Sequence, residues 1–350
     1  MNLQYIVSYL KDVLVREPLM LWRWYSMRRG GRRTEKRDGL GAQNDALKGV
    51  FDTPIQADGA NIGDCGAMVF CADGRMPHGG MFDRLKGAVS VYAAAKVLGR
   101  DFRICFTSPF VLERYLEPNV YDWRIGEDGR CESVCGARPV VMYGEWSNPR
   151  RLLKRRHREA QFYYGYDSLA YINRRCGTQF DWGELYGELF RPTAYLQQYI
   201  DDCKRGLGDN YVAVHLRFMN LLGDKTEFDV DPTLPASEQE SLMVRALAEL
   251  RGVMARNSGK RVLLATDSAT FVERVHREEP EVQFIPGEIK HIGTAAETSD
   301  GAVVKMFIDY YMIAGAERVY NIVGPGMWPS AFPEYAAKIG RCSFERISFK

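Results

Sequence analysis

The sequence predicts an α/β protein whose second half is a parallel, doubly wound sheet. From residue 211 onwards, short apolar runs alternate with stretches of helical spacing, which is the pattern of βα units. The 350 residues correspond to about two domains. Apolar residues make up 46% of the chain and charged residues 26%, so an ordinary globular fold with a sizeable core is expected.

The elements of the second half follow one another in order. Strands are short apolar runs that end in polar residues, and helices are the longer stretches between them. At the start of the first helix, Ser237 as N-cap and Glu240 three residues later fit a capping box. Strands are expected at 211–216, 261–268, 282–286 and 318–323, and helices at 237–256, 270–277, 302–316 and 331–339.

A shorter α/β pattern begins earlier in the chain, with a glycine-containing turn between its first strand and its first helix. Strands are expected at 68–72, 102–106 and 138–143, the turn at 73–87, and helices at 88–98 and 192–204. Backbone N–H groups at a helix start favour anions, and Gly79 and Gly80 would let a ligand approach closely. An ordinary βα connection explains the turn equally well, so both interpretations stay open.

The N-terminal segment differs from the rest of the chain. Apolar residues at helical spacing are followed by Trp22, Trp24 and Tyr25, and then by a basic stretch. Aromatic rings beside basic charge fit peripheral membrane contact through residues 1–40, and a helix packed on the domain body fits equally. The expected divisions are 1–60 for this helical and basic segment, 61–207 for an N-terminal α/β domain and 208–350 for a C-terminal Rossmann-type domain.

Charge and hydropathy exclude several classes of protein. The net charge of +2 argues against a dedicated nucleic-acid binder. No apolar run approaches the roughly 18 residues that a membrane-spanning helix needs, and no secretory signal is visible at the start. The basic run at 150–158 is typical of a solvated helix face, with contact to an anionic acceptor or a membrane as the alternative.

The eight cysteines are scattered and do not suggest a disulfide scaffold. Cys105 lies inside an apolar run and is interpreted as a small core residue. Cys131 and Cys135 are closely spaced, but a second pair at zinc-site spacing is missing, so no metal site is expected. A reducing, cytoplasmic location is the simplest interpretation of this cysteine usage.

The chain is organised around the run from Tyr211 to Asn220. The apolar residues of this run lead to His215 and Arg217, which are separated by a single residue, so their side chains share one face of the strand end. Open α/β sheets bind ligands at the carboxyl ends of their strands. Because a guanidinium offers a planar fork of donors, Arg217 is a candidate for binding phosphate oxygens. A strand end that is polar without binding anything is the alternative.

Several blocks of the second half form a recognisable series. The run Tyr211–Arg217 is followed by Lys260–Ser268, by Glu297–Asp309, and by a strand to Val323 with Ser330-Ala-Phe332 after it. In order and spacing these blocks resemble the inverting fucosyltransferases that use GDP-fucose. That superfamily includes the α1,6-fucosyltransferases of N-glycan core and nodulation-factor synthesis and the protein O-fucosyltransferases. A weaker resemblance to the same superfamily lies at Gly79–Val97.

The resemblance implies a GT-B-like pair of Rossmann-type domains facing a cleft, with the donor bound by the C-terminal domain and the acceptor on the N-terminal side. It implies transfer from a GDP-sugar without a metal or other cofactor. By this resemblance, Arg217 would hold the donor diphosphate and His215 would lie near the ribose or phosphate. Asp267, followed by Ser268, would accept hydrogen bonds from guanine, with a helix cap as the alternative role. Donor contacts would also come from Ser330, Phe332, Gly79 and Gly80.

The chain also departs from these relatives. Phe218 stands where several of them carry a second arginine, and the loop at 324–329 is longer and richer in Gly and Pro. An inverting transfer needs a carboxylate to deprotonate the acceptor hydroxyl, and both Asp224 and Glu227 are candidates.

The expected function is fucose transfer from GDP-fucose to a glycan or glycoconjugate. The alternatives are a glycosyltransferase with another nucleotide sugar, and a non-catalytic nucleotide- or sugar-binding protein on the same scaffold.

Overall fold

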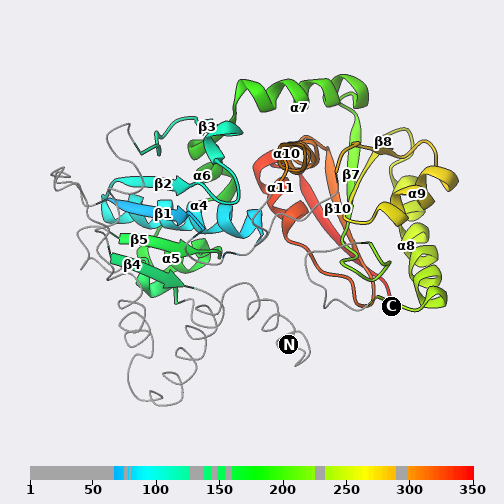
Figure 1. Ribbon diagram of the computed structural model, residues 1–350, viewed down its shortest axis with the longest axis horizontal. Coiled ribbons are helices and arrows are strands. Elements are labelled where there is room, and N and C mark those ends of the chain that lie inside the picture. Colours follow the sequence, from blue (N-terminus) through cyan, green and yellow to red (C-terminus); the bar gives the residue numbers. More distant parts are fainter. Residues whose placement is uncertain are drawn as a thin grey trace, which may run out of the picture. The chain divides into compact units, whose positions relative to one another are not determined.

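The computed structural model describes residues 67–74, 78, 80–125, 138–142, 148–153, 160–224, 233–288 and 298–350. These residues form two compact units, each with its own parallel sheet (Figure 1). The first unit holds the described residues up to Ser108 and from Asp122 to Phe180. The second holds Pro109–Tyr121 and the described residues from Asp181 onwards.

The sheet of the first unit has four strands in the order β2-β1-β5-β4, all parallel. Its elements are β1 (Met68–Ala72), α4 (Met81–Leu98), β2 (Phe102–Phe106), β4 (Arg138–Met142), a 3-10 turn at Pro149–Arg151, β5 (Ala160–Tyr164) and α5 (Leu169–Cys176). Helix α4 starts seven residues before the expected position, because Met81, Phe82 and Leu85 are already buried against the unit. In its middle, Gly87 lets Tyr164 approach, since a Cβ there would lie 1.8 Å from the Tyr164 carbonyl oxygen.

One cysteine of this unit differs from the expectation. Cys105 in β2 is disulfide-bonded rather than an unpaired core residue, and its partner lies outside the described residues. Apolar surroundings alone did not reveal the bond, since a buried free thiol and a buried disulfide both suit a strand. The free cysteines among the described residues are Cys71, Cys176, Cys203 and Cys342.

The sheet of the second unit has five parallel strands in the order β11-β10-β7-β8-β9. The expected strands are confirmed, and an additional one follows the last helix. The central elements are β7 (Tyr211–Leu216), α8 (Ala236–Arg256), β8 (Arg261–Thr266), α9 (Ala269–Glu278), β9 (Gln283–Phe284), α10 (Asp300–Ala314), β10 (Arg318–Val323), α11 (Phe332–Gly340) and β11 (Ser343–Ser348). Strand β11 is an edge strand with Glu345 and Arg346 in it, so it lacks the apolar run that marks the buried strands.

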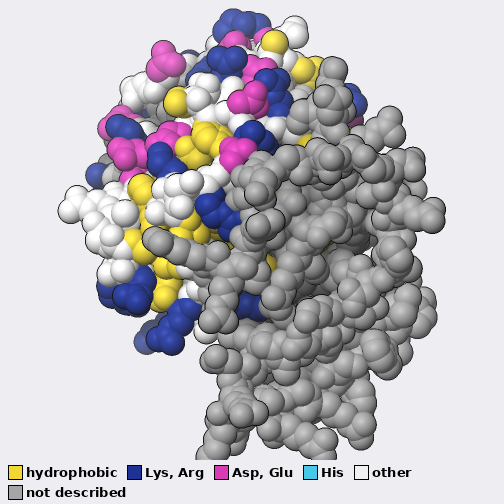
Figure 2. Space-filling view, turned by 90° about the vertical axis from the view of Figure 1, so that its left-hand side faces the viewer, with side chains coloured by type: hydrophobic (Ala, Val, Ile, Leu, Met, Phe, Trp, Pro, Cys, Tyr) yellow, Lys and Arg dark blue, Asp and Glu magenta, His cyan; other side chains and the backbone are white. Residues whose placement is uncertain are grey.

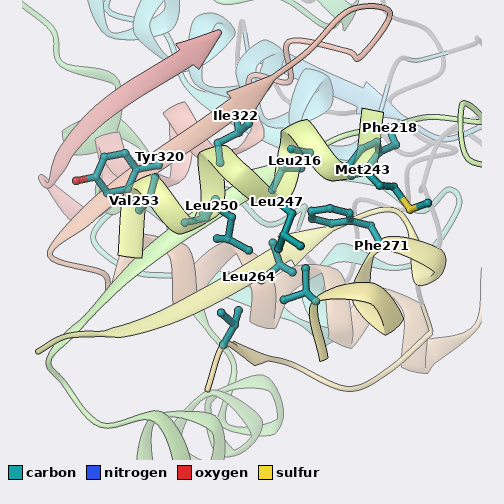
Figure 3. Packing of buried hydrophobic residues seen from close by; sticks show 14 of the residues in the cluster. Leu216, Phe218, Met243, Leu247, Leu250, Val253, Leu264, Phe271, Tyr320 and Ile322 are labelled. Atoms are coloured by element: carbon teal, nitrogen blue, oxygen red, sulfur yellow. The ribbon is translucent and has the colours of Figure 1, made fainter. Parts of the chain in front are cut away.

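Alternate residues of β7 serve opposite faces of this sheet. Val212, Val214 and Leu216 join a core with residues of α8 and α9, such as Leu247 and Phe271 (Figure 3). On the other face, the Tyr211 hydroxyl donates to the carbonyl of Met312 in α10, at 2.5 Å. The sheet is therefore covered on both sides, as a parallel sheet requires.

Helix α8 shows where a local motif did not decide the structure. The helix begins at Ala236 after Pro235, without a side-chain cap, so the expected capping box of Ser237 and Glu240 is wrong. Both carboxylate oxygens of Glu240 instead accept hydrogen bonds from Arg274 of α9, at 2.8 and 2.7 Å. A tertiary ion pair between neighbouring helices takes the place of the local cap.

Two further helices precede the central sheet in the second unit. They are α6 (Trp182–Leu189) and α7 (Ala194–Leu207), accompanied by a short antiparallel pair of β3 (Leu116–Pro118) and β6 (Phe190–Pro192) and a 3-10 turn at Leu112–Arg114. Trp182 packs edge-on against Tyr335, with ring centroids 4.7 Å apart, and the Tyr186 and Tyr311 hydroxyls lie 2.8 Å from each other. These contacts join α6 to α10 and α11 of the second unit, to which α7 also belongs. The expected domain division at residue 207 stays a prediction.

None of the described helices is long and apolar enough to cross a membrane. The segment 1–60, the aromatic and basic residues in it, and most of the basic run at 150–158 lie outside the described residues. In the upper region of Figure 2, basic and acidic side chains are intermixed, in keeping with the small net charge.

Two glycines test this packing. Gly340 at the end of α11 faces α10 so closely that a Cβ would lie 1.8 Å from the Ala314 carbonyl oxygen, whereas Gly252 in α8 faces open space. Gly340→Ala should lower the free energy of unfolding by about 1–3 kcal/mol through overpacking. Gly252→Ala should raise it by about 0.5–1 kcal/mol, because alanine favours the helix. Urea unfolding of both variants checks this, and equal effects at the two positions would contradict the helix contact.

Candidate functional site

The candidate site lies where three neighbouring strands of the second unit end. Strand β7 lies between β10 and β8, with His215 paired in register with Asn321 on one side and Ala265 on the other. All three strands are parallel, so their carboxyl ends meet at one edge of the sheet. The residues that follow them are therefore brought together, as expected for a ligand site in an open α/β sheet.

Asp267 holds the chain that follows β7. Its two carboxylate oxygens accept hydrogen bonds from the backbone N–H groups of Phe218 and Met219, at 2.8 and 3.0 Å. Met219 has a φ of 56°, in the left-handed region that costs a residue with a side chain roughly 1–2 kcal/mol. The two hydrogen bonds offset this cost, so Asp267 fixes a turn immediately after Arg217.

Arg217 is held by this turn but retains free donor capacity. Its Nε lies 3.0 Å from the Met219 sulfur and 3.9 Å from Asp267 Oδ2, which is the outer limit of an ion pair. The side chain is 19% exposed, and its terminal nitrogens make no hydrogen bond to any described residue. Two parallel N–H donors therefore remain for a ligand with paired oxygens.

Charge in this cluster is poorly solvated. Burial raises the pKa of Asp267, while Arg217 and the backbone N–H groups of Phe218 and Met219 counteract some of the rise. An ionised Asp267 next to Arg217 leaves the pair close to neutral. Asp267 thus balances the charge of Arg217 without occupying its terminal nitrogens, which stay available to an anionic ligand.

His215 lies deeper, on the face of the sheet that α11 covers. Its side chain is buried and stacks on Phe332, with ring centroids 5.5 Å apart and an interplanar angle of 27°. Its Nδ1 has no hydrogen-bond partner. Burial, and secondly the charge of Arg217, lowers the pKa of His215 to about 3. The imidazole is therefore neutral at physiological pH and can serve as a hydrogen-bonding group rather than as a cation.

Asn321 is a member of the site that the sequence analysis did not identify. It is fully buried in β10, its Nδ2 donates to the Ser330 carbonyl at 3.0 Å, and its Oδ1 has no partner. The Ser330 hydroxyl in turn accepts from the Phe332 N–H at the start of α11, at 3.2 Å. In the sequence, the available sign was an amide side chain inside a mostly apolar strand.

Asp224 lies at the start of α9, where its carboxylate is hydrogen-bonded. Its oxygens accept from the Ser268 hydroxyl at 2.5 Å and from the N–H and hydroxyl of Thr270 at 3.1 Å each. The Ser268 hydroxyl itself accepts from the Phe271 N–H and is the N-cap of α9. Asp224 and Ser268 thus cap this helix together, and a role of Asp224 as general base stays a prediction.

The remaining expected residues are more scattered. Glu227 and Gly79 lie outside the described residues. Gly80 belongs to the first unit, where its carbonyl accepts from the N–H groups of Asp83 and Arg84 at the start of α4. The described residues include no group of three His, Cys, Asp or Glu side chains that could hold a metal ion.

The departure at Phe218 has a structural explanation. The residue follows Arg217 and therefore turns to the opposite face, where it is fully buried and packs on Phe271 with ring centroids 4.8 Å apart (Figure 3). An arginine here would bury a charge in an apolar core. The chain consequently carries its site cation at Arg217 and uses the next position for packing.

Comparison with known proteins yields similarity at the level of structure. No family model and no curated protein matches the sequence. The NodZ α-1,6-fucosyltransferase soaked with GDP-fucose matches with 16% identity and a TM-score of 0.51, over 78% of this chain and 92% of that chain. Selenomethionine NodZ from Bradyrhizobium gives the same identity and TM-score over 77% and 91%. Arabidopsis thaliana FUT1 in complex with GDP matches with 14% identity and a TM-score of 0.53, over 92% and 78%.

The two NodZ structures are fucosyltransferases by name, as the resemblance in the sequence led us to expect. Their likeness to this chain confirms the expected α/β fold with GT-B-like architecture. The four blocks of sequence thus identified the fold although overall identity is low.

The neutral state of His215 leads to a pH prediction. Since its pKa is near 3 in the folded protein and near 6.5 when unfolded, the unfolded chain takes up the proton first as the pH falls. Between pH 8 and pH 5 the wild type should lose roughly 2 kcal/mol more stability than His215→Gln. Urea unfolding at both pH values measures this, with His276→Gln at an exposed histidine as control. Parallel pH dependence of wild type and His215→Gln would contradict the assignment.

Proposed function

We propose that the chain is an inverting glycosyltransferase that moves fucose from GDP-fucose to a glycan or glycoconjugate acceptor. The observation that carries the proposal is the guanidinium of Arg217 at the carboxyl end of β7. Asp267 fixes the turn behind it, and its terminal nitrogens are unbound by the described residues. A leaving diphosphate needs such a fixed donor, because charge develops on it as the glycosidic bond breaks.

The donor would lie across the ends of the three strands. Arg217 would bind the diphosphate, and the neutral His215 would contact the ribose or a phosphate oxygen. Asp267 would accept from guanine: a carboxylate has about four lone-pair sites, and two backbone N–H groups leave some of them free. Ser330 and Phe332 at the start of α11 would add contacts from a helix N-terminus, which favours anions. The solved neighbours with GDP-fucose and GDP support this choice of donor.

Catalysis would rest on positioning and on stabilisation of the leaving diphosphate. A carboxylate must also take the proton from the acceptor hydroxyl in an inverting transfer. Glu227 fits this role better than Asp224, because Asp224 already accepts three hydrogen bonds at the start of α9. Neither a metal nor another cofactor is included in the proposed reaction.

We also propose a cellular compartment for the reaction. The disulfide at Cys105 favours an oxidising compartment over the cytoplasm that the cysteine pattern suggested. Peripheral membrane contact through residues 1–40 is compatible with either place. Thiol titration of the denatured protein with and without reductant tests whether this disulfide is present in the purified protein.

A non-catalytic nucleotide-sugar-binding protein is the second candidate. The observation that favours it is Asp224, one of two candidate bases, which the fold uses to cap α9. Steady release of GDP from GDP-fucose in the presence of an acceptor would exclude this candidate. Binding of GDP-fucose without any release of GDP would favour it.

The donor assignment predicts nucleotide binding that depends on Arg217. Titration calorimetry in excess chelator should show binding of GDP and GDP-fucose, and weaker binding of GDP-mannose and UDP-sugars. Arg217→Ala should lower turnover about 10²–10³-fold through loss of one electrostatic donor, and should weaken GDP binding. Arg217→Lys should recover only a fraction of the turnover, because an ammonium lacks the bidentate fork.

Stability provides the control for this experiment. The 3.9 Å ion pair with Asp267 is partly exposed, so Arg217→Ala should cost no more than about 1 kcal/mol of unfolding free energy. Arg205→Ala, at an exposed arginine of α7, should change neither GDP binding nor turnover. Normal GDP affinity in Arg217→Ala would refute the assignment of Arg217 to the diphosphate.

A further inference from the structure

The loop between β10 and α11 carries a tryptophan that the proposed function has not used. Trp328 is 56% exposed, whereas Trp123 and Trp182 are 1% and 3% exposed. The other exposed aromatic side chains among the described residues are Tyr199 and Tyr166, at 41% and 36%. Single exposed apolar residues are common on protein surfaces, so exposure alone does not indicate a binding site.

Trp328 differs from these residues because hydrogen bonds hold the loop on both sides of it. The preceding residue, Met327, is buried in the core under β7 and β10, and its N–H donates to the Gly324 carbonyl at 3.1 Å. The Gly324 N–H lies 3.1 Å from the Met327 sulfur. On the other side, the Ser330 N–H donates to the Trp328 carbonyl at 2.8 Å. The backbone is thus fixed while the indole is left uncovered.

A further backbone hydrogen bond connects Trp328 to the candidate site. The backbone N–H of Trp328 donates to the carbonyl of Arg217 at 3.1 Å. The indole is therefore attached to a segment that is hydrogen-bonded to the residue assigned to the diphosphate. Ser330, two residues on, is held by Asn321, the strand partner of His215. Any displacement of this loop would therefore disturb the donor contacts as well.

The order of the strands indicates which end of a bound donor would lie near Trp328. Strand β7 lies between β10 and β8. Asp267 follows β8, whereas Trp328 follows β10, so the two residues lie on opposite sides of Arg217. If the nucleobase of a donor lies towards Asp267 and its diphosphate at Arg217, the sugar and the acceptor extend towards Trp328.

We propose that Trp328 is a stacking platform for a pyranose ring of the carbohydrate acceptor. The inference rests on the proposed function for the direction of the donor. An indole offers a flat apolar face, and a pyranose with axial C–H groups offers a matching one, so their contact removes apolar surface from water. Because the loop is already ordered, little conformational entropy is lost when the ring binds.

The test uses two β1,4-linked oligosaccharides whose rings expose axial C–H groups on both faces, cellotetraose and tetra-N-acetylchitotetraose. Calorimetric titrations with each are made with and without saturating GDP, on wild type, Trp328→Ala and Trp328→Phe. At least one oligosaccharide should bind the wild type, and Trp328→Ala should weaken that binding about tenfold, the size of one aromatic contact. Trp328→Phe should recover most of it, and GDP affinity should stay within about twofold in both variants.

Tyr199→Ala, at an exposed aromatic residue of α7, is the matched control and should bind both ligands as the wild type does. The inference is overturned if neither oligosaccharide binds the wild type, or if Trp328→Ala binds it equally well. It is also overturned if Trp328→Ala loses GDP affinity, because the indole would then contact the donor. Failure of the wild type to bind GDP would refute the proposed function instead, and the titrations without GDP would still decide the role of Trp328.

Discussion

The site depends on one interaction, the pair of hydrogen bonds from the Phe218 and Met219 N–H groups to the Asp267 carboxylate. It joins the ends of β7 and β8 and holds Met219 in a conformation that a residue with a side chain rarely adopts. Phe218 is thereby directed into the core and Arg217 to the opposite side. The same carboxylate lies 3.9 Å from the guanidinium, so backbone geometry and charge balance are set by a single side chain.

A second set of contacts completes the arrangement on the β10 side. His215 stacks on Phe332, while Asn321 holds the Ser330 carbonyl and Ser330 accepts from the Phe332 N–H. Since burial keeps His215 uncharged, Arg217 is the cation of this cluster of described residues, and an anion would be attracted to it rather than to the imidazole. The start of α11 and the loop before it are therefore positioned by contacts with β7 and β10.

Much of this could be predicted because buried parallel strands leave a strong signal. The apolar runs ending at Leu216, Thr266 and Val323 marked the sheet, and the two-residue spacing placed His215 and Arg217 on one face. What depends on tertiary contacts could not be predicted. The sequence near Asp224 does not reveal that α9 needs its carboxylate, and nothing local shows that Asn321 would bind the carbonyl of Ser330. Cys105 is similar, because its disulfide depends on a partner distant in sequence.

The central claim is that Asp267 organises the turn before any ligand arrives. Hydrogen exchange of the Phe218 and Met219 amides in ligand-free wild type and Asp267→Asn tests it most directly. Asparagine replaces one acceptor oxygen by a donor, so at least one of the two amides should exchange about tenfold faster in the variant. Protection of the Val214 amide inside β7 should be unchanged. Equal protection of Phe218 and Met219 in both proteins would contradict the account.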